Sequence, residues 1–135
     1  HVTFTNTAFA FAINDDWVQQ EQGNFNPTPG PGSLVFSDIK ISNVAGSQLV
    51  DPSHKRAAVS FNCIWSNSCT GITFNNVNIW SSDGSLMTAE CRNAVGTGYC
   101  LDSPGAGSEK LITQLFNGKA VPVPTNDPFT GPFTR

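Results

Sequence analysis

The chain has 135 residues, with 7 basic and 10 acidic side chains and a formal net charge of −3. Only 13% of its residues are charged, about half the usual share, whereas Asn, Ser, Thr and Gly make up more than a third. This composition excludes a charge-driven disordered tail, and the acidic balance argues against a nucleic-acid-binding protein. No apolar run has the length of a membrane-spanning helix. Few Lys and Glu residues and many β-branched, aromatic and short polar residues indicate an all-β fold.

Three segments share one local pattern. Residues 2–9, 34–41 and 72–79 each place an aliphatic residue two positions before a Phe and an Asn or Asp two positions after it. Apolar residues alternate on either side of that polar position, which predicts two short strands joined by a corner. Asn tolerates the left-handed backbone conformation, so it suits such a corner.

The repeat predicts a right-handed parallel β-helix of about three turns, because repeats that cannot bury an apolar face alone are built to stack. We expect Phe4, Phe36 and Phe74 to lie in register inside this solenoid. The corner residues Asn6 and Asn76 are expected to form hydrogen-bonded ladders. A β-sandwich with coincidentally similar strands is the alternative, although it would favour hairpin signals such as Asn-Gly between strands.

The remaining segments surround the repeat. Two further strands are expected at 9–13 and 57–61, and residues 19–33 and 45–56 are expected to be loops. Residues 108–118 predict a short helix, whose apolar stripe would cover the open end of the stack. We expect the Pro-rich tail that follows to lie extended against the outside of the solenoid.

Four cysteines fall in two close pairs, Cys63 with Cys69 and Cys91 with Cys100. Neither spacing matches the usual zinc knuckle, and both histidines lie far away in sequence. We therefore predict two local disulfides in a secreted, extracellular protein, with a zinc site as the weaker alternative, and we expect no metal and no cofactor.

Residues 56–63 and 69–80 resemble the last coils of glycoside hydrolase family 28, with the fungal rhamnogalacturonan hydrolases as the most similar branch. Residues 91–101 are similar to the second cysteine loop of that branch, and residues 115–124 to its C-terminal tail. The resemblance implies a C-terminal portion of a secreted enzyme that hydrolyses pectic polysaccharide with inversion. It assigns 1–101 to the last coils of a parallel β-helix and 102–135 to the helix and tail.

The aspartate motifs that carry catalysis in this family have no counterpart in the chain. Inverting hydrolysis needs two carboxyl groups roughly 6.5–9.5 Å apart. We therefore expect no catalytic residue here, with the acids supplied by upstream coils of the same enzyme. The alternative is a non-catalytic carbohydrate-binding or structural β-solenoid module.

Five residues are candidate contacts to a pectic chain. The resemblance places Trp17 where relatives carry a sugar-contacting Tyr, and a flat indole suits a subsite wall. Asp15 and Asp16 precede it; one of them is a candidate for hydrogen bonding to a sugar, and the alternative is that both are turn formers at the end of a strand. Lys55 and Arg56 precede the strand at 57–61 and are candidates to bind galacturonate carboxylates at the rim of the same cleft. A solvated loop without a role in binding is the alternative, and the one we favour.

Overall fold

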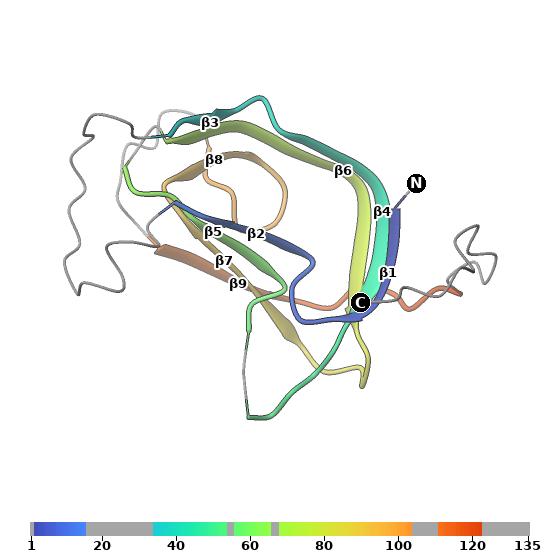
Figure 1. Ribbon diagram of the computed structural model, residues 1–135. Helices are drawn as coiled ribbons and strands as arrows, with labels where there is room; N and C mark the ends of the chain where they lie inside the picture. Colours follow the sequence, from blue (N-terminus) through green and yellow to red (C-terminus); the bar gives the residue numbers. More distant parts are fainter. Residues whose placement is uncertain (1, 16–33, 54–55, 66–67, 104–110, 123–135) are drawn as a thin grey trace, which may run out of the picture.

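The computed structural model describes residues 2–15, 34–53, 56–65, 68–103 and 111–122. These residues form an all-β structure without a helix (Figure 1). The strands, in chain order, are β1 (Val2–Thr7), β2 (Phe11–Asn14), β3 (Phe36–Ser37), β4 (Lys40–Gln48), β5 (Val59–Asn62), β6 (Cys69–Ser81), β7 (Met87–Arg92), β8 (Ala94–Thr97) and β9 (Leu111–Phe116).

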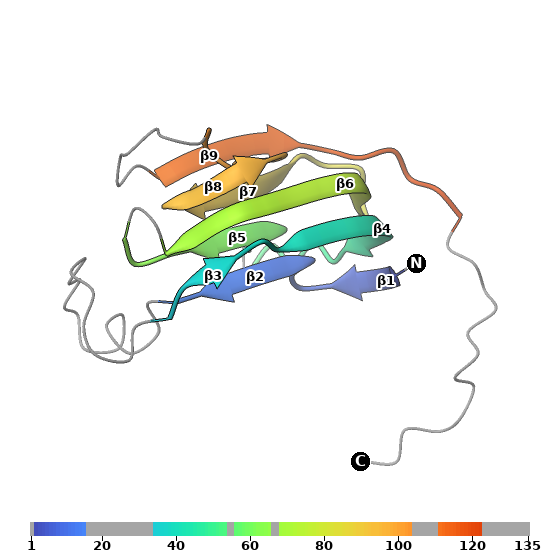
Figure 2. The ribbon, with the colours of Figure 1, turned by 90° about the horizontal axis from the view of Figure 1, so that it is seen from above.

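The strands form two sheets, and successive passes of the chain contribute to both. In the first sheet β1, β4 and β6 pair in parallel, and β3 and β8 also pair in parallel with β6. In the second sheet β2, β5 and β7 pair in parallel, and β9 joins antiparallel to β7. Figure 2 shows the passes layered on one another, and Figure 1 shows the two sheets enclosing a common interior.

The interior is filled by side chains that alternate along the second sheet. In β7, Met87, Ala89 and Cys91 are buried, whereas the residues between them face outward. Aromatic rings link the passes, because the Phe74 ring lies with its centroid 4.9 Å from that of Tyr99 and 5.4 Å from that of Phe11. Ring pairs at such distances add stability beyond the burial of their area. The core is therefore continuous through the stack.

The predicted corners are present. Asn6, Asp38 and Asn76 have left-handed φ values of 51°, 56° and 51°. This conformation is tolerated best by Asn and Asp among residues with a Cβ, so the local interpretation of the pattern is confirmed.

The predicted stacking of the three phenylalanines is wrong. Phe74 pairs with Ile41, whereas Phe36 pairs with Cys69 and Phe4 pairs with Gly46. The reason is that the first sheet contains more than one left-handed corner per pass. The sequence repeat aligned the corner at Asp38 with the corner at Asn76. In the structure, the corner at Asn43 is the one that lies beside Asn76.

The asparagine ladder is present with a different partner from the one expected. Asn76 donates from Nδ2 to Oδ1 of Asn43 at 2.8 Å, and Asn43 is itself left-handed, with a φ of 56°. Asn6 instead accepts at Oδ1 a hydrogen bond from Oγ of Ser47. The ladder therefore joins β4 to β6 and does not include Asn6.

The helix predicted for residues 108–118 is wrong where the structure describes this segment. Leu111–Phe116 forms β9, which pairs antiparallel along the whole of β7. The edge of β7 would otherwise expose unpaired backbone groups next to the core, and pairing it outweighs the weak helical preference of the segment. In β9, Ile112 and Phe116 are partly buried while Leu111 and Leu115 are exposed. The segment covers the open edge, as expected, but as a strand.

The residues after β9 cover the rest of that edge. The amide of Gly118 donates to the carbonyl of Ile79 at 2.8 Å, and Asn78 donates from Nδ2 to the carbonyl of Lys119 at 2.7 Å. These contacts pair the second half of β6, beyond the part that β8 covers. At the opposite face of the stack, β1 and β2 have no further strand beside them among the described residues.

The two further strands predicted from the sequence are present, whereas the loop between them is shorter than predicted. The expected strands at 9–13 and 57–61 are seen as β2 and β5. The loop expected at 45–56 begins later, because β4 continues through Gln48.

Both predicted disulfides are present, Cys63 with Cys69 and Cys91 with Cys100. Within the described part of the chain there is no helix long and apolar enough to cross a membrane.

Candidate functional site

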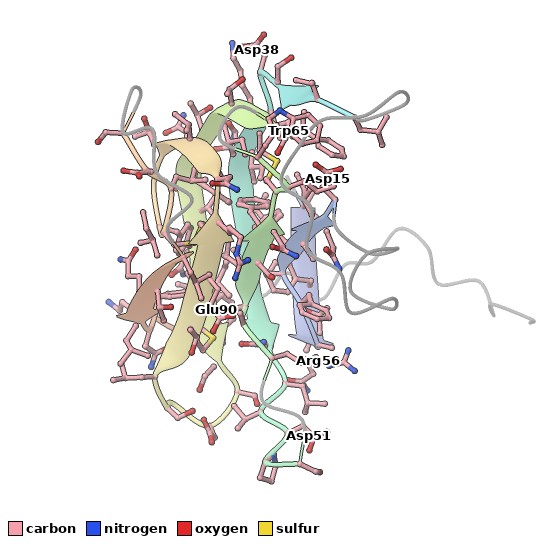
Figure 3. The ribbon with its side chains drawn as sticks, turned by 90° about the vertical axis from the view of Figure 1, so that its left-hand side faces the viewer. Asp15, Asp38, Asp51, Arg56, Trp65 and Glu90 are labelled. Carbon is pink, nitrogen blue, oxygen red and sulfur yellow. A yellow bond between two sulfur atoms is a disulfide. The ribbon has the colours of Figure 1, made fainter. Side chains whose placement is uncertain are left out.

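A groove of about 460 Å³ lies on the outer face of the second sheet, crossing β2, β5 and β7. Figure 3 shows this face, with Glu90 on β7 near its centre. The described residues that line the groove are Phe9, Ala12, Ile13, Asn14, Ser60, Phe61, Asn62, Glu90, Arg92 and Leu111. Most of them are the outward-facing residues of strands whose other face forms the core.

The parallel register sets the polar groups of the groove in two rows. Asn14 pairs with Asn62 and Asn62 with Arg92, which forms one row across the strands. In the neighbouring row Ser60 pairs with Glu90. Neighbouring strands lie about 4.8 Å apart, so each row presents polar groups at that regular spacing.

One row is ordered by its own hydrogen bonding. Asn62 donates from Nδ2 to Oδ1 of Asn14 at 3.1 Å. The Asn62 amide has further donor and acceptor capacity, since an amide carries two donor hydrogens and an oxygen with two lone pairs. The row therefore presents donors and acceptors in fixed positions, with a guanidinium at Arg92 and a carboxylate at Glu90 beside it.

Apolar side chains accompany these groups. Phe9, 40% exposed, and Leu111, 48% exposed, both line the groove. A mixed groove of this kind suits a ligand with apolar faces and many hydroxyl groups. Among the described residues no group of three or more His, Cys, Asp or Glu side chains could hold a metal ion.

Asp15 lies immediately after β2, next to the groove but not among its lining residues. Its amide donates to the carbonyl of Asn62, and its Oδ2 accepts from the amide of Ile64 at 3.4 Å. The carboxylate thus contacts the start of the loop closed by the first disulfide. Asp16 and Trp17 lie outside the described residues.

Arg56 lies at the other end of the sheet from Asp15 (Figure 3). Its guanidinium carbon is 5.1 Å from the centroid of the Phe9 ring, and its carbonyl accepts from Nε2 of Gln48. Arg56 lines a separate hollow of about 360 Å³ together with Asp51 and Leu86. The structure therefore does not bring Asp15 and Arg56 together, although Phe9 connects Arg56 to the groove. Lys55 lies outside the described residues.

The sequence reasoning missed Asn14, Asn62, Glu90 and Arg92 as groove residues. The signal was present in residues 87–92, where Met, Ala and Cys alternate with Thr, Glu and Arg. Such alternation is typical of a strand with one buried and one exposed face. The resemblance assigned residues 91–101 to a cysteine loop, so no strand was predicted at 87–92.

Two titratable groups outside the groove are strongly perturbed. Burial raises the pKa of Tyr99 to about 12. Hydrogen bonds from Ser81 and Ser85 lower the pKa of Asp83 to about 2. The Tyr99 ring packs against Phe74 and Phe116, and Asp83 lies in the turn between β6 and β7. Neither is a general acid or base for a ligand in the groove.

Comparison with known proteins finds fungal relatives along most of the chain. The chain is 32% identical to a protein described as probable rhamnogalacturonase C of Aspergillus flavus, and 35% identical to one so described from Aspergillus niger. Each match covers 93% of this chain and 28% of the relative. Rhamnogalacturonase A of Emericella nidulans is 27% identical, over 80% of this chain and 20% of its own length.

The chain thus spans under a third of the length of the curated relatives it matches. No family model matches the chain. No solved structure matches it either.

Proposed function

We propose that the chain belongs with the rhamnogalacturonases of glycoside hydrolase family 28 and forms the C-terminal part of a secreted hydrolase of pectic polysaccharide. In this proposal residues 1–101 are the last coils of a right-handed parallel β-helix. Residues 102–135 cover the end of that stack, with β9 in place of the helix expected from the sequence.

The asymmetry of the two ends of the stack carries the proposal. At one end β9 pairs with β7, and Gly118 with the second half of β6, so backbone groups beside the core are satisfied. At the other end, among the described residues, no strand pairs with the outer edges of β1 and β2. Partly buried apolar side chains such as Phe4 and Phe11 lie at this end. Preceding coils would pair with these edges and complete the burial.

The parallel pairing favours a β-helix over a β-sandwich. A sandwich is built from antiparallel neighbours, whereas here the pairs that join successive passes are parallel. One antiparallel pair is described, between β7 and β9, where the chain turns back to cover the edge.

The groove is where we propose that the polysaccharide binds. The ordered amides of Asn14 and Asn62 suit sugar hydroxyls, and Arg92 suits a carboxylate. Among the described lining residues Glu90 is the sole carboxylate, whereas inverting hydrolysis needs a pair. The catalytic acids are therefore proposed to lie on upstream coils.

The residues predicted from the sequence remain proposals. Trp17 would wall a sugar subsite beyond β2, with Asp15 or Asp16 hydrogen-bonding a sugar. Lys55 and Arg56 would contribute positive charge at the far rim. The two buried disulfides fit export to an oxidising compartment, which supports the proposed secretion.

The test compares the complete polypeptide with the 135-residue chain alone on rhamnogalacturonan and on polygalacturonate. We expect the complete polypeptide to release reducing ends with inversion, followed by NMR of the anomeric protons, and the isolated chain to release none. Hydrolysis by the homogeneous isolated chain would contradict the proposed placement of the acids.

One observation keeps a second function in view for the chain taken alone. The groove is formed, yet its described lining offers a single carboxylate. A non-catalytic carbohydrate-binding module would look the same. Binding of pectic oligosaccharides without hydrolysis by the complete polypeptide would favour that function.

A further inference from the structure

The end of the last strand carries a chemically reactive pair of residues. Asn117 and Gly118 follow β9 directly and form the one Asn-Gly dipeptide of the sequence, at the edge of the stack (Figure 2). Because glycine has no side chain, its backbone nitrogen can approach the carboxamide carbon of the preceding Asn closely. Asn is among the thermolabile residues of proteins. Asn117 is exposed, so water has access to the product of such an attack.

The packing of the strand end requires glycine at position 118. The amide of Gly118 donates to the carbonyl of Ile79 at 2.8 Å. A Cβ at this position would overlap that carbonyl and Oδ1 of Asn78. The close approach to β6 therefore excludes every residue with a side chain, and the unhindered nitrogen beside Asn117 is a consequence of the fold.

The Asn117 carboxamide fastens the strand end to the turn between β6 and β7. Its Oδ1 accepts a hydrogen bond from the amide of Ser81 at 3.2 Å. Its Nδ2 donates to the carbonyl of Gly84 at 2.9 Å. Both ends of the carboxamide are thus engaged, and the side chain joins the last strand to β6 and to the turn that follows it.

This geometry opposes attack by the Gly118 nitrogen. The nitrogen must lose its proton to react, whereas in the folded chain that proton is donated to Ile79. The carboxamide must also turn toward the nitrogen, which breaks its bonds to Ser81 and Gly84. The reaction therefore proceeds from local openings in which residues 117–119 leave β6.

Conversion of Asn117 to Asp would reverse the contact with Gly84. Nδ2 is a donor, whereas the carboxylate oxygen that replaces it only accepts, and it would face the Gly84 carbonyl oxygen. A like charge stands one residue away, because hydrogen bonds from Ser81 and Ser85 lower the pKa of Asp83 to about 2 and keep it ionised at neutral pH. The modified strand end therefore loses its attachment to the turn.

We propose that Asn117 is a site of spontaneous deamidation and that its modification releases the strand end from β6. The Gly118 nitrogen bonds to Cγ of Asn117, the Cγ–Nδ2 bond breaks, and ammonia leaves with the proton from the Gly118 nitrogen. Water then opens the cyclic imide at either carbonyl, which gives aspartate or isoaspartate. Either product leaves the second half of β6 without its covering segment. The inference is independent of the proposed polysaccharide ligand.

The first test compares deamidation of the complete polypeptide in buffer and in urea, at one mildly alkaline pH and one temperature. Peptide mapping by mass spectrometry follows the loss of the Asn117 carboxamide over time. We expect the reaction in buffer to be about tenfold to a hundredfold slower, because opening breaks several hydrogen bonds.

Two variants show whether local opening controls the rate. Asn78→Ala removes the hydrogen bond from β6 to the carbonyl of Lys119, and it should speed the reaction in buffer about fivefold without changing the rate in urea. Gln114→Ala, at an exposed position of β9, is the matched control and should change neither rate.

The second test examines the consequence of the modification in Asn117→Asp. Hydrogen exchange should show protection of the Ser81 and Gly118 amides lowered about tenfold or more. Gln114→Glu makes the same change from amide to carboxylate on the same strand and should leave this protection intact. Unchanged protection of the β5 amides shows that each variant is folded.

Equal deamidation rates in buffer and in urea would overturn the proposal, since the carboxamide would then not be held. A rate in buffer that does not respond to Asn78→Ala would overturn the proposed local opening. Unchanged protection in Asn117→Asp would show that the modification releases nothing. Each of these results would leave the proposed function standing.

Discussion

Replacing Phe74 by Ala tests the observed register of the core. Phe74 contacts the rings of Phe11, Phe61 and Tyr99, with centroids 5.4, 6.0 and 4.9 Å away, so one substitution removes three aromatic contacts. Truncating a buried Phe costs about 3–5 kcal/mol, and each aromatic pair contributes about 0.5–1.5 kcal/mol beyond area. Because Phe74 is only partly buried, we expect a loss near the lower value, about 3 kcal/mol.

The matched control is Phe36→Ala. Phe36 is also partly buried and lies in the same sheet, but it pairs with Cys69. We expect it to cost roughly 1–2 kcal/mol, the transfer of part of one side chain. Urea unfolding followed by circular dichroism gives both values, and a loss of about 3 kcal/mol should lower Tm by roughly 10 °C. Equal losses for the two variants would refute the register and favour the in-register stacking expected from the sequence repeat.

Three further predictions follow from the described contacts. In Gly96→Ala the new Cβ would overlap a carbonyl of β6, so the strands must separate, and the free energy of unfolding should fall by about 1–3 kcal/mol. The control Gly84→Ala has open space but a φ of +81°, and by the same urea assay it should lose about 1 kcal/mol. Removing the second disulfide in the double variant Cys91→Ala/Cys100→Ala should cost about 2–3 kcal/mol, measured by thermal unfolding, and an unchanged Tm would contradict this. Tyr99 is the single tyrosine, and burial raises its pKa to about 12, so absorbance at alkaline pH should show ionisation well above pH 10. The contribution of the buried, protonated ring to stability should be complete below pH 10 and lost as the pH rises toward 12. Ionisation near pH 10 in the folded chain would contradict its burial.

The sequence predicted features that depend on a few neighbouring residues. The left-handed Asn and Asp corners follow from residue chemistry, and the disulfides follow from short spacings. The relatives found by comparison agree with the family that the motifs resemble. Each of these predictions needed no knowledge of which strands pair.

The predicted register was wrong, because the repeat matched the corner at Asp38, and not the corner at Asn43, with the corner at Asn76. The better alignment sets residues 39–44 against 72–77, so that Asn43 meets Asn76. Both segments have the pattern aliphatic-x-apolar-x-Asn-Val, which is a closer match than that between residues 34–41 and 72–79. Because the wrong corner was aligned, Phe36 was predicted beside Phe74, whereas it pairs with Cys69.

The last strand shows how tertiary pairing decides between local preferences. Residues 111–116 carry apolar residues at spacings compatible with a helix, yet Ile112 and Phe116 also fit one face of a strand. The unpaired edge of β7 decided the outcome, and that edge is not visible in local sequence. The groove was not predicted, because its residues come from three separate passes and the strand at 87–92 was not expected.

The most direct test of the central claim is one activity measurement on two proteins. Purified complete polypeptide and purified 135-residue chain are incubated with rhamnogalacturonan at equal molar concentration, and reducing ends are counted over time. Our account predicts steady hydrolysis by the complete polypeptide and none by the chain, because the described residues that line the groove include a single carboxylate, whereas inverting hydrolysis needs two. Hydrolysis of rhamnogalacturonan by the isolated chain, or inactivity of the complete polypeptide on it, would contradict it.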